Sequence, residues 1–404
     1  MSVNSPLARR MPGFDARHAT RRARRSRLAV AFVVVIGAGA LLYVFLGRTP
    51  ARPAASIRRS PTSATVPRVV TTLATWRLKA PITRTVVLPW TPASGDQMVI
   101  LGGATTGGAT ASGVFGLDVN QGALSQVGYL RNTLDNAAGA VLDGQAMVFG
   151  GTTASGTASL SVQGLPMGAS ASNVSGTVVP EATVLGSLPQ PRASATAVTV
   201  GATAYLVGGD SGTGPDPDIL ATSDGRNFST VAALAVPVDS PAVAVLGSKL
   251  YVFGGLATAG AASGHPVNTI QVVNLTTHKV TAAGHLPEPL AGASAVALGQ
   301  RVLLAGGDSA PPGAQSHGST TVAGASTSTA APAASSVSTV WSFDPSSATC
   351  TAVGHLSVAV SHAGVAVVAS TAWLVGGESG GTAVSAVQSL AIAPSPSHPA
   401  KKKN

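Results

Sequence analysis

Short apolar runs separated by polar turns recur along most of the chain, and six of these runs end in two glycines. They are MVILGG (98–103), AMVFGG (146–151), AYLVGG (204–209), LYVFGG (250–255), VLLAGG (302–307) and AWLVGG (372–377). Runs of about five apolar or β-branched residues bounded by Gly, Pro, Ser or Asn predict β-strands. The second glycines lie 48, 58, 46, 52 and 70 residues apart, so the pattern also predicts an internal repeat.

Each repeat contains four predicted strands around its glycine pair. A first strand of small residues, such as SATAVTV (194–200), precedes the run that ends in Gly-Gly. A third strand follows a variable Gly/Ser/Thr loop, as in TIQVVNL (269–275), and a fourth strand ends on Leu130, Leu286 or Leu356. Four short strands at a period of about 50 residues, without helical periodicity, are typical of a β-propeller blade. Six copies predict one closed ring.

The order of these motifs resembles the kelch repeat across residues 69–393. The resemblance is carried by Leu-Pro-Gln-Pro-Arg (188–192), by LYVFGG (250–255) and by the strands that follow. It departs from the family in the fourth strand, where Val127, Val280 and Val353 stand near the usual Trp. The resemblance implies an all-β, six-bladed kelch-type β-propeller, and the residues that precede it separately predict a single transmembrane α-helix.

The sixth repeat has no fourth strand of its own. Its third strand, AVSAVQSLAIA (383–393), is followed by Pro394, Pro396 and a lysine-rich tail at 394–404. An additional segment, VVTTLATWRL (69–78), precedes the first repeat and has the form of a fourth strand, with Trp76. We expect 69–78 to pair with the C-terminal strands and to close the ring.

A membrane span is predicted ahead of the repeats. Residues 28–46 contain nineteen residues without a charge, which is about 28 Å of helix and matches the hydrocarbon core. Residues 1–27 hold eight arginines and one acid, so this basic tail is expected in the cytoplasm and the propeller outside the cell membrane. A cleaved signal peptide is the competing interpretation, but its apolar region would be shorter. The Pro/Ser/Thr/Arg stretch 47–68 is expected to be a linker.

Charge is distributed unevenly between this N-terminal region and the repeats. The formal net charge is +10, yet residues 85–400 contain six basic and fourteen acidic residues. A DNA-binding domain needs a basic face on its folded part, so nucleic acid is not an expected partner. The lipid bilayer is the expected partner of 28–46. The low-complexity stretch 309–338 explains the 70-residue interval and is predicted to be an insertion between the second and third strands of repeat five.

Polar residues beside the glycine pairs are the candidate ligand-binding site. Asp210, Asp308 and Glu378 directly follow a glycine pair. Strand alternation places the loops between second and third strands, and the loops between blades, on one rim of the ring. We therefore expect those acids to share this rim with the inter-blade residues Arg84, Arg131, Arg192 and Glu288. Two interpretations remain open, a ligand-binding rim and ordinary loop polarity with turn capping.

The histidines and the single cysteine do not indicate a metal or cofactor site. No His-x-His or His-Glu-x-x-His spacing occurs. The resemblance extends to galactose oxidase, which uses a Cys–Tyr cross-link, a further Tyr and two His with copper. Cys350 lies inside a predicted fourth strand, and no match to that set is found. The expected function is an interaction scaffold that binds an envelope protein or polymer through its rim. The alternative is an extracytoplasmic enzyme, carbohydrate-acting or oxidase-like, with an unrecognised rim site.

Overall fold

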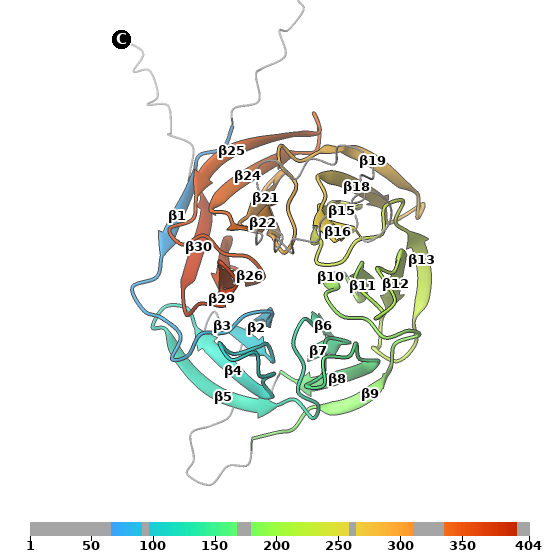
Figure 1. The fold of residues 1–404 in the computed structure, drawn as a ribbon, viewed down its shortest axis with the longest axis vertical. Coiled ribbons are helices and arrows are strands. Elements are labelled where there is room, and N and C mark those ends of the chain that lie inside the picture. Colours follow the sequence, from blue (N-terminus) through green and yellow to red (C-terminus); the bar gives the residue numbers. More distant parts are fainter. Residues whose placement is uncertain (1–65, 91–96, 168–178, 258–263, 310–334, 394–404) are drawn as a thin grey trace, which may run out of the picture. The chain divides into compact units, whose positions relative to one another are not determined.

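The computed structural model describes residues 66–90, 97–167, 179–257, 264–309 and 335–393. These residues form six four-stranded antiparallel sheets, arranged as blades around a central opening (Figure 1). The predicted all-β, six-bladed propeller is therefore confirmed. Among these residues no helix is long and apolar enough to cross a membrane. The predicted span 28–46, its flanking segments 1–27 and 47–65, and the tail 394–404 lie outside the described residues.

Each blade contains an inner strand, two middle strands and an outer strand. Blade 1 consists of β2 (Val86–Trp90), β3 (Gln97–Leu101), β4 (Gly113–Asp118) and β5 (Ala123–Tyr129), and blade 2 of β6 (Ala138–Leu142), β7 (Gln145–Phe149), β8 (Ser161–Pro166) and β9 (Thr183–Ser187). Blade 3 consists of β10 (Thr196–Val200), β11 (Thr203–Val207), β12 (Asp218–Thr222) and β13 (Ser229–Ala233), and blade 4 of β14 (Ala242–Leu246), β15 (Lys249–Phe253), β18 (Thr269–Asn274) and β19 (Val280–His285). Blade 5 consists of β20 (Ser294–Leu298), β21 (Arg301–Ala305), β24 (Thr339–Asp344) and β25 (Thr349–His355).

Blade 6 combines the two ends of the repeat region. It consists of β26 (Gly364–Val368), β27 (Thr371–Val375), β30 (Val387–Ile392) and β1 (Val69–Leu73). Three two-stranded hairpins follow the glycine pairs of blades 4, 5 and 6. They are β16 (Leu256–Ala257) with β17 (His265–Pro266), β22 (Asp308–Ser309) with β23 (Ser335–Ser336), and β28 (Glu378–Ser379) with β29 (Thr382–Ala383). The hairpin of blade 5 forms the base of the predicted insertion.

The ring closes through β1, which pairs with β30 from Val69 opposite Ile392 to Leu73 opposite Gln388. The pairing expected for 69–78 is thus found over its first five residues, and Trp76 lies beyond the strand, where its ring stacks on Trp373. β30 begins beside the glycine pair of blade 6, since the Gly376 amide donates to the Ala386 carbonyl. β30 therefore ends on the opposite face, where Ala393 bonds to Arg68. Both ends of the described chain leave the propeller on that face.

The hydrophobic core is divided into six clusters, one between each pair of neighbouring blades. The cluster between blades 6 and 1, for example, joins Val87 and Met98 to Val375 and Val387. A single blade exposes both faces of its sheet, so it buries its apolar side chains only when a neighbour stands on each side. Closure of the ring therefore completes the last of these clusters.

The glycine pairs connect each blade to the next. Both glycines of every pair have positive φ, and the second glycine donates its amide hydrogen to a backbone carbonyl in the segment that enters the following blade. The six acceptors are the carbonyls of Leu134, Arg192, Val238, Leu290, Val360 and Ile82, at 2.8–3.0 Å. A Cβ on the first glycine would overlap the same carbonyl in each case. Only glycine, which has no Cβ, allows the carbonyl to come this close. The glycine pair therefore recurs in all six repeats.

Buried glutamines fix the entry segments of blades 2, 4 and 6. In blade 4 the Val236 amide donates to the side-chain oxygen of Gln271 at 3.0 Å, and the Gln271 amide nitrogen donates to the Val236 carbonyl at 2.8 Å. Gln163 and Gln388 make the same pair of bonds with Asn132 and Val358. Each glutamine therefore satisfies both polar groups of one backbone residue.

Replacing Gln271 with Leu is expected to lower the free energy of unfolding by about 1–3 kcal/mol, because the Val236 amide and carbonyl lose their partners. Urea unfolding followed by tryptophan fluorescence measures the change. Gln121→Leu, at an exposed turn, is the control and is expected to change stability by less than about 0.5 kcal/mol. Equal stabilities for the two variants would contradict a structural role for the glutamine.

Candidate functional site

Six residues in the left-handed conformation surround the opening of the central channel, one at the entry of each inner strand. We call them the mouth residues: Arg84, Asn136, Ser194, Ser240, Gly292 and His362, with φ between 48° and 59°. The backbone amide of each donates to the carbonyl of the previous one, and the Arg84 amide donates to the His362 carbonyl. The six bonds measure 2.8–3.1 Å and form a closed circle. This circle holds the loops of all six blades at fixed positions around one opening.

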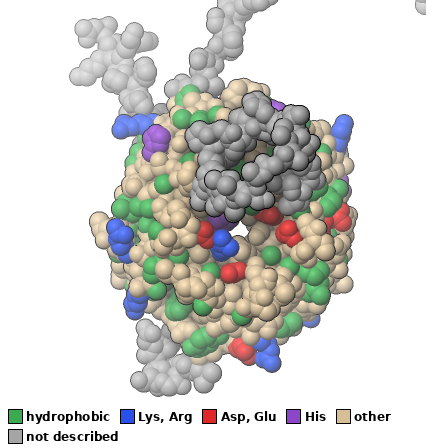
Figure 2. Space-filling model, in the orientation of Figure 1, with side chains coloured by type: hydrophobic (Ala, Val, Ile, Leu, Met, Phe, Trp, Pro, Cys, Tyr) green, Lys and Arg blue, Asp and Glu red, His purple; other side chains and the backbone are tan. Residues whose placement is uncertain are grey.

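Blades 2 to 6 each place one carboxylate beside this circle. The five are Asp135, Asp210, Asp239, Asp308 and Glu378, and we call them the mouth acids. Each belongs to a backbone bridge that joins the entry segment of its blade to the loop after the glycine pair. Acidic side chains, one basic side chain and a histidine border the opening in the space-filling view (Figure 2). Blade 1 contributes Arg84, so the part of the mouth that the structure describes holds five acids, one arginine and one histidine.

Two of the mouth acids contact the cationic residues. The Arg84 Nε donates to Glu378 Oε1 at 2.6 Å, and the Thr83 hydroxyl donates to the same oxygen at 3.1 Å. His362 Nε2 lies 3.6 Å from Asp308 Oδ2. Burial alone would raise the pKa of Asp308, but hydrogen bonds from His362, Ser361 and Ser336 hold this pKa below its ordinary value. Asp308 therefore stays ionised.

The remaining mouth acids face other polar groups. Burial raises the pKa of Asp135, which faces Arg84 and Glu378, and also that of Asp239, which faces Asp210 and His362. Asp210 accepts a hydrogen bond from the Gly212 amide at 2.5 Å and caps its own loop. The mouth thus combines fixed negative charge with two carboxyl groups that bind a proton more readily than usual. Such a ring can recognise cationic groups and hydrogen-bond donors.

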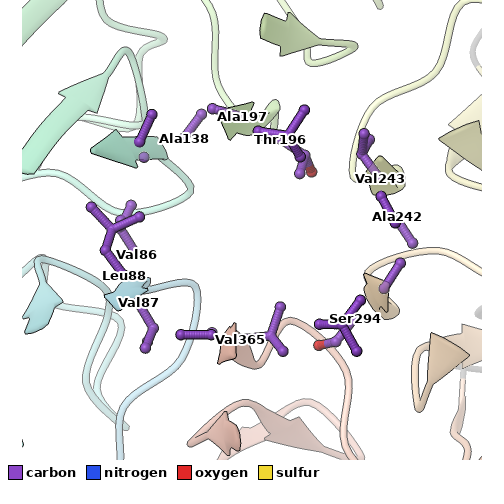
Figure 3. Close-up of a pocket in the computed structure, with 18 of the residues that line it drawn as sticks. Val86, Val87, Leu88, Ala138, Thr196, Ala197, Ala242, Val243, Ser294 and Val365 are labelled. Atoms are coloured by element: carbon purple, nitrogen blue, oxygen red, sulfur yellow. The ribbon is translucent and has the colours of Figure 1, made fainter. Parts of the chain in front are cut away.

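Below the mouth most side chains that line the channel are apolar. Its cavity has a volume of about 510 Å³ and is lined by the six inner strands. Figure 3 shows side chains such as Val86, Ala197, Val243 and Val365 bordering the opening, with Thr196 and Ser294 among them. No ionisable side chain lines this cavity among the described residues. The charged side chains of the described channel therefore lie at its mouth and not along this cavity.

The predicted rim residues fall into three groups: residues at the mouth, residues on the rim outside the mouth, and the buried Arg192. Asp210, Asp308, Glu378 and Arg84 lie at the mouth. Arg131 lies at the outer end of an inter-blade segment and is paired with Glu181 at 2.9 Å in solvent. Glu288 is half-buried in the corresponding segment that enters blade 5. These two are on the rim but are not part of the mouth.

The sequence prediction for Arg192 is wrong. It was expected on the rim, but only 2% of its surface is exposed. Its guanidinium pairs with Asp216 and donates to the carbonyls of Gly208 and Asp218 at 3.1 and 2.7 Å. Arg192 therefore joins the entry segment of blade 3 to its second and third strands, and it cannot contact a ligand.

Sequence reasoning did not identify Asp135, Asp239 and His362 as rim residues. Asp135 and Asp239 both lie sixteen residues before the second glycine of their repeat, at the position taken by Ala193, Ala291 and Ser361 in blades 3, 5 and 6. Aligning the repeats on the glycine pair would have placed these residues beside the predicted acids. In the first repeat the distance in sequence between the entry segment and the glycine pair is different, so Arg84 was identified only from its charge.

The described acids and the histidine of the mouth do not form a metal centre. Among the described residues no group of three or more His, Cys, Asp or Glu side chains could hold a metal ion. Cys350 is half-buried in β25, and burial raises its pKa to about 11, so its thiol stays protonated.

The fold and its mouth define a class, the six-bladed kelch-type propeller, a fold that typically serves as a protein-interaction scaffold. The family model for the KLHDC2/KLHL20/DRC7 Kelch-repeats domain matches residues 90–307, more than half of the chain. The chain therefore belongs to this kelch-repeat family. It is similar to a solved structure titled "Structure of YjhT", with a TM-score of 0.58 and 15% identity over 77% of this chain and 95% of that one. That likeness concerns the fold alone. A comparison with curated proteins finds no match.

Proposed function

We propose that the chain is a membrane-anchored, extracytoplasmic interaction scaffold that binds cationic segments of an envelope protein or polymer at the mouth. The observation that carries this proposal is the closed backbone circle with five mouth acids around it. A rigid circle presents the carboxylates without a reordering cost when a partner binds. Loops on a rigid scaffold are also where binding residues concentrate.

The N-terminal charge pattern supports the topology in this proposal. Residues 1–27 hold eight arginines and one acid, and the uncharged segment 28–46 follows them. With 28–46 as a membrane anchor and 47–68 as a linker, the propeller would lie outside the cell membrane. Protease treatment of intact cells tests this topology: the propeller is expected to be digested and residues 1–27 to be protected. Protection of the propeller instead would contradict the extracytoplasmic location.

Binding of a fluorescent hexalysine peptide tests the mouth. We expect Asp210→Asn/Asp308→Asn to weaken binding by the full chain in non-ionic detergent by about tenfold, because two negative charges leave the opening. Asparagine keeps the shape of the side chain and an acceptor oxygen. Fluorescence anisotropy titration measures the affinity at low ionic strength.

A variant with the same change in net charge on the opposite face is the control. Asp118 and Asp143 lie at strand turns on that face. Asp118→Asn/Asp143→Asn is expected to bind hexalysine as the unmodified chain does. Equal weakening in both double variants would mean that only net charge matters, and the proposal for the mouth would be wrong.

A further inference from the structure

A second pocket lies between blades 4 and 5, on the face opposite the mouth. It has a volume of about 280 Å³, and Lys249, Tyr251, Asn274, Lys279, Thr281 and Phe343 are among its lining residues. Lys249 begins β15 directly after the turn from the inner strand, at the end of the blade away from the glycine pair. The pocket is therefore separate from the mouth acids, and its chemistry does not depend on them.

The strand register places its polar side chains in two rows on one face of blade 4. Lys249 is opposite Asn274. The backbone amide of Asn274 donates a hydrogen bond to the Lys279 carbonyl. In the next row Tyr251 is opposite Val272, which is opposite Thr281. Directly opposed residues share a sheet face with Cβ atoms about 5 Å apart, so the two lysines flank Asn274 on the same side.

The groups available in this pocket are hydrogen-bond donors. The side-chain oxygen of Asn274 already accepts the amides of Thr276 and Thr277 at 2.9 and 3.0 Å, which leaves its NH₂ group to donate. Among the described residues neither lysine takes part in an ion pair. Tyr251 is buried against Phe343, with ring centroids 5.4 Å apart, and burial raises its pKa, so the phenol keeps its proton.

No acidic side chain is among the described lining residues. Asp344 precedes the lining residue Pro345 in blade 5, but Arg301 already pairs with it at 2.9 Å. The two lysines, Asn274 and the hydroxyl-bearing residues that line the pocket therefore have no acidic partner among its described lining residues. A tetrahedral oxyanion offers acceptor oxygens in several directions and suits such a set.

We propose that this pocket binds a phosphate group, with Lys249 and Lys279 on two sides of the phosphate and the side-chain NH₂ group of Asn274 between the two lysines. Its source is either soluble phosphate or the headgroup of an anionic lipid, since the described chain begins and ends on the same face as the pocket. The inference is independent of the proposed role of the mouth, and the two are tested by different ligands on opposite faces.

Site-specific lysine acetylation of the full chain in non-ionic detergent tests the proposal. Modification of each lysine is quantified by mass spectrometry with sodium phosphate, and with sodium chloride at the same ionic strength. We expect about 10 mM phosphate to slow acetylation of Lys249 and Lys279 by about fivefold. Lys79, an exposed lysine elsewhere on the propeller, is the internal control and is expected to stay unchanged. No protection at Lys249 and Lys279, or equal protection at Lys79, would overturn the proposal.

Asn274→Asp is the matched variant. Aspartate keeps an oxygen to accept the Thr276 and Thr277 amides, so the turn is retained, but the donor is replaced by a carboxylate. The ratio of acetylation rates with and without phosphate is expected to return to about one. Protection that persists in this variant would contradict the proposed geometry.

Two lipid analogues distinguish the sources. Dihexanoyl phosphatidylglycerol, added below its micelle concentration, contains the phosphate, whereas dihexanoylglycerol does not. Protection by the phospholipid at lower concentration than inorganic phosphate supports a lipid headgroup, and the reverse order supports soluble phosphate. Protection by dihexanoylglycerol equal to that by the phospholipid would show that phosphate is not recognised, and would overturn the proposal.

Discussion

Gly306→Ala is expected to lower the free energy of unfolding by about 3–5 kcal/mol, or to prevent folding. Gly306 has a φ of 66°, and a Cβ there would overlap the Val360 carbonyl, which accepts the Gly307 amide at 2.9 Å. The methyl group would have to displace the entry segment of blade 6 and break the bond between blades 5 and 6. The effect thus combines backbone strain with steric overlap. Urea unfolding of the full chain in detergent measures it.

The same blade offers a matched control. Gly299 has a φ of 60° in the turn between β20 and β21, and no atom lies within 4 Å of a Cβ built on it. Gly299→Ala therefore introduces the left-handed strain without the overlap, and should cost about 1–2 kcal/mol. If the two variants were equally stable, the first glycine of each pair would be needed only for its φ, and the proposed contact between blades would be wrong.

Arg192→Gln is expected to cost about 3–5 kcal/mol, because it leaves the buried carboxylate of Asp216 without its partner. Arg192 also donates to the Gly208 and Asp218 carbonyls, so the entry segment of blade 3 loses two further hydrogen bonds to the blade. Thermal unfolding monitored by circular dichroism is the measurement, with Arg131→Gln as the control. Arg131 pairs with Glu181 in solvent, and its loss should cost less than about 1 kcal/mol.

A double variant separates buried charge from simple truncation. Arg192→Met/Asp216→Asn removes both charges while Asn can still accept the Asp218 amide, as Asp216 does at 2.8 Å. It is expected to recover at least about half of the stability lost in Arg192→Gln, since no buried charge remains unpaired. A double variant less stable than Arg192→Gln would contradict a dominant role for the unpaired carboxylate.

The blade architecture could be predicted from the sequence because the glycine pairs repeat with the blade. The number of copies predicted the number of blades, and the missing fourth strand of the sixth repeat predicted the partner of 69–78. Both features depend on backbone geometry that only certain residue types permit, such as positive φ beside a carbonyl. Because of such constraints the same residue type stands at the same position of each repeat, where it can be recognised in the sequence.

The mouth could be predicted only in part, because its circle is made by backbone atoms. The six mouth residues share a left-handed conformation and one hydrogen-bonding role, yet they are Arg, Asn, Ser, Ser, Gly and His. Apart from the charge of Arg84, residue type therefore gave no signal at these positions. Arg192 was misplaced for a related reason: a charged residue in a loop is usually exposed, and its partner Asp216 is distant in sequence and became adjacent only through blade 3.

The propeller is a single closed ring only if β1 completes blade 6, and a designed disulfide between β1 and β30 tests this pairing. Val70 and Ala391 are opposed in the β1–β30 register, and antiparallel partners have Cα atoms about 4.5–5.5 Å apart, within reach of a disulfide. In a Cys350→Ser background, Val70→Cys/Ala391→Cys is expected to form an intramolecular bond in oxidising buffer, identified by mass spectrometry of the linked peptides. Thr72→Cys/Ala391→Cys, two residues out of register, is expected not to form it. An absent bond in the first pair, or a bond between two chains, would contradict the closed ring.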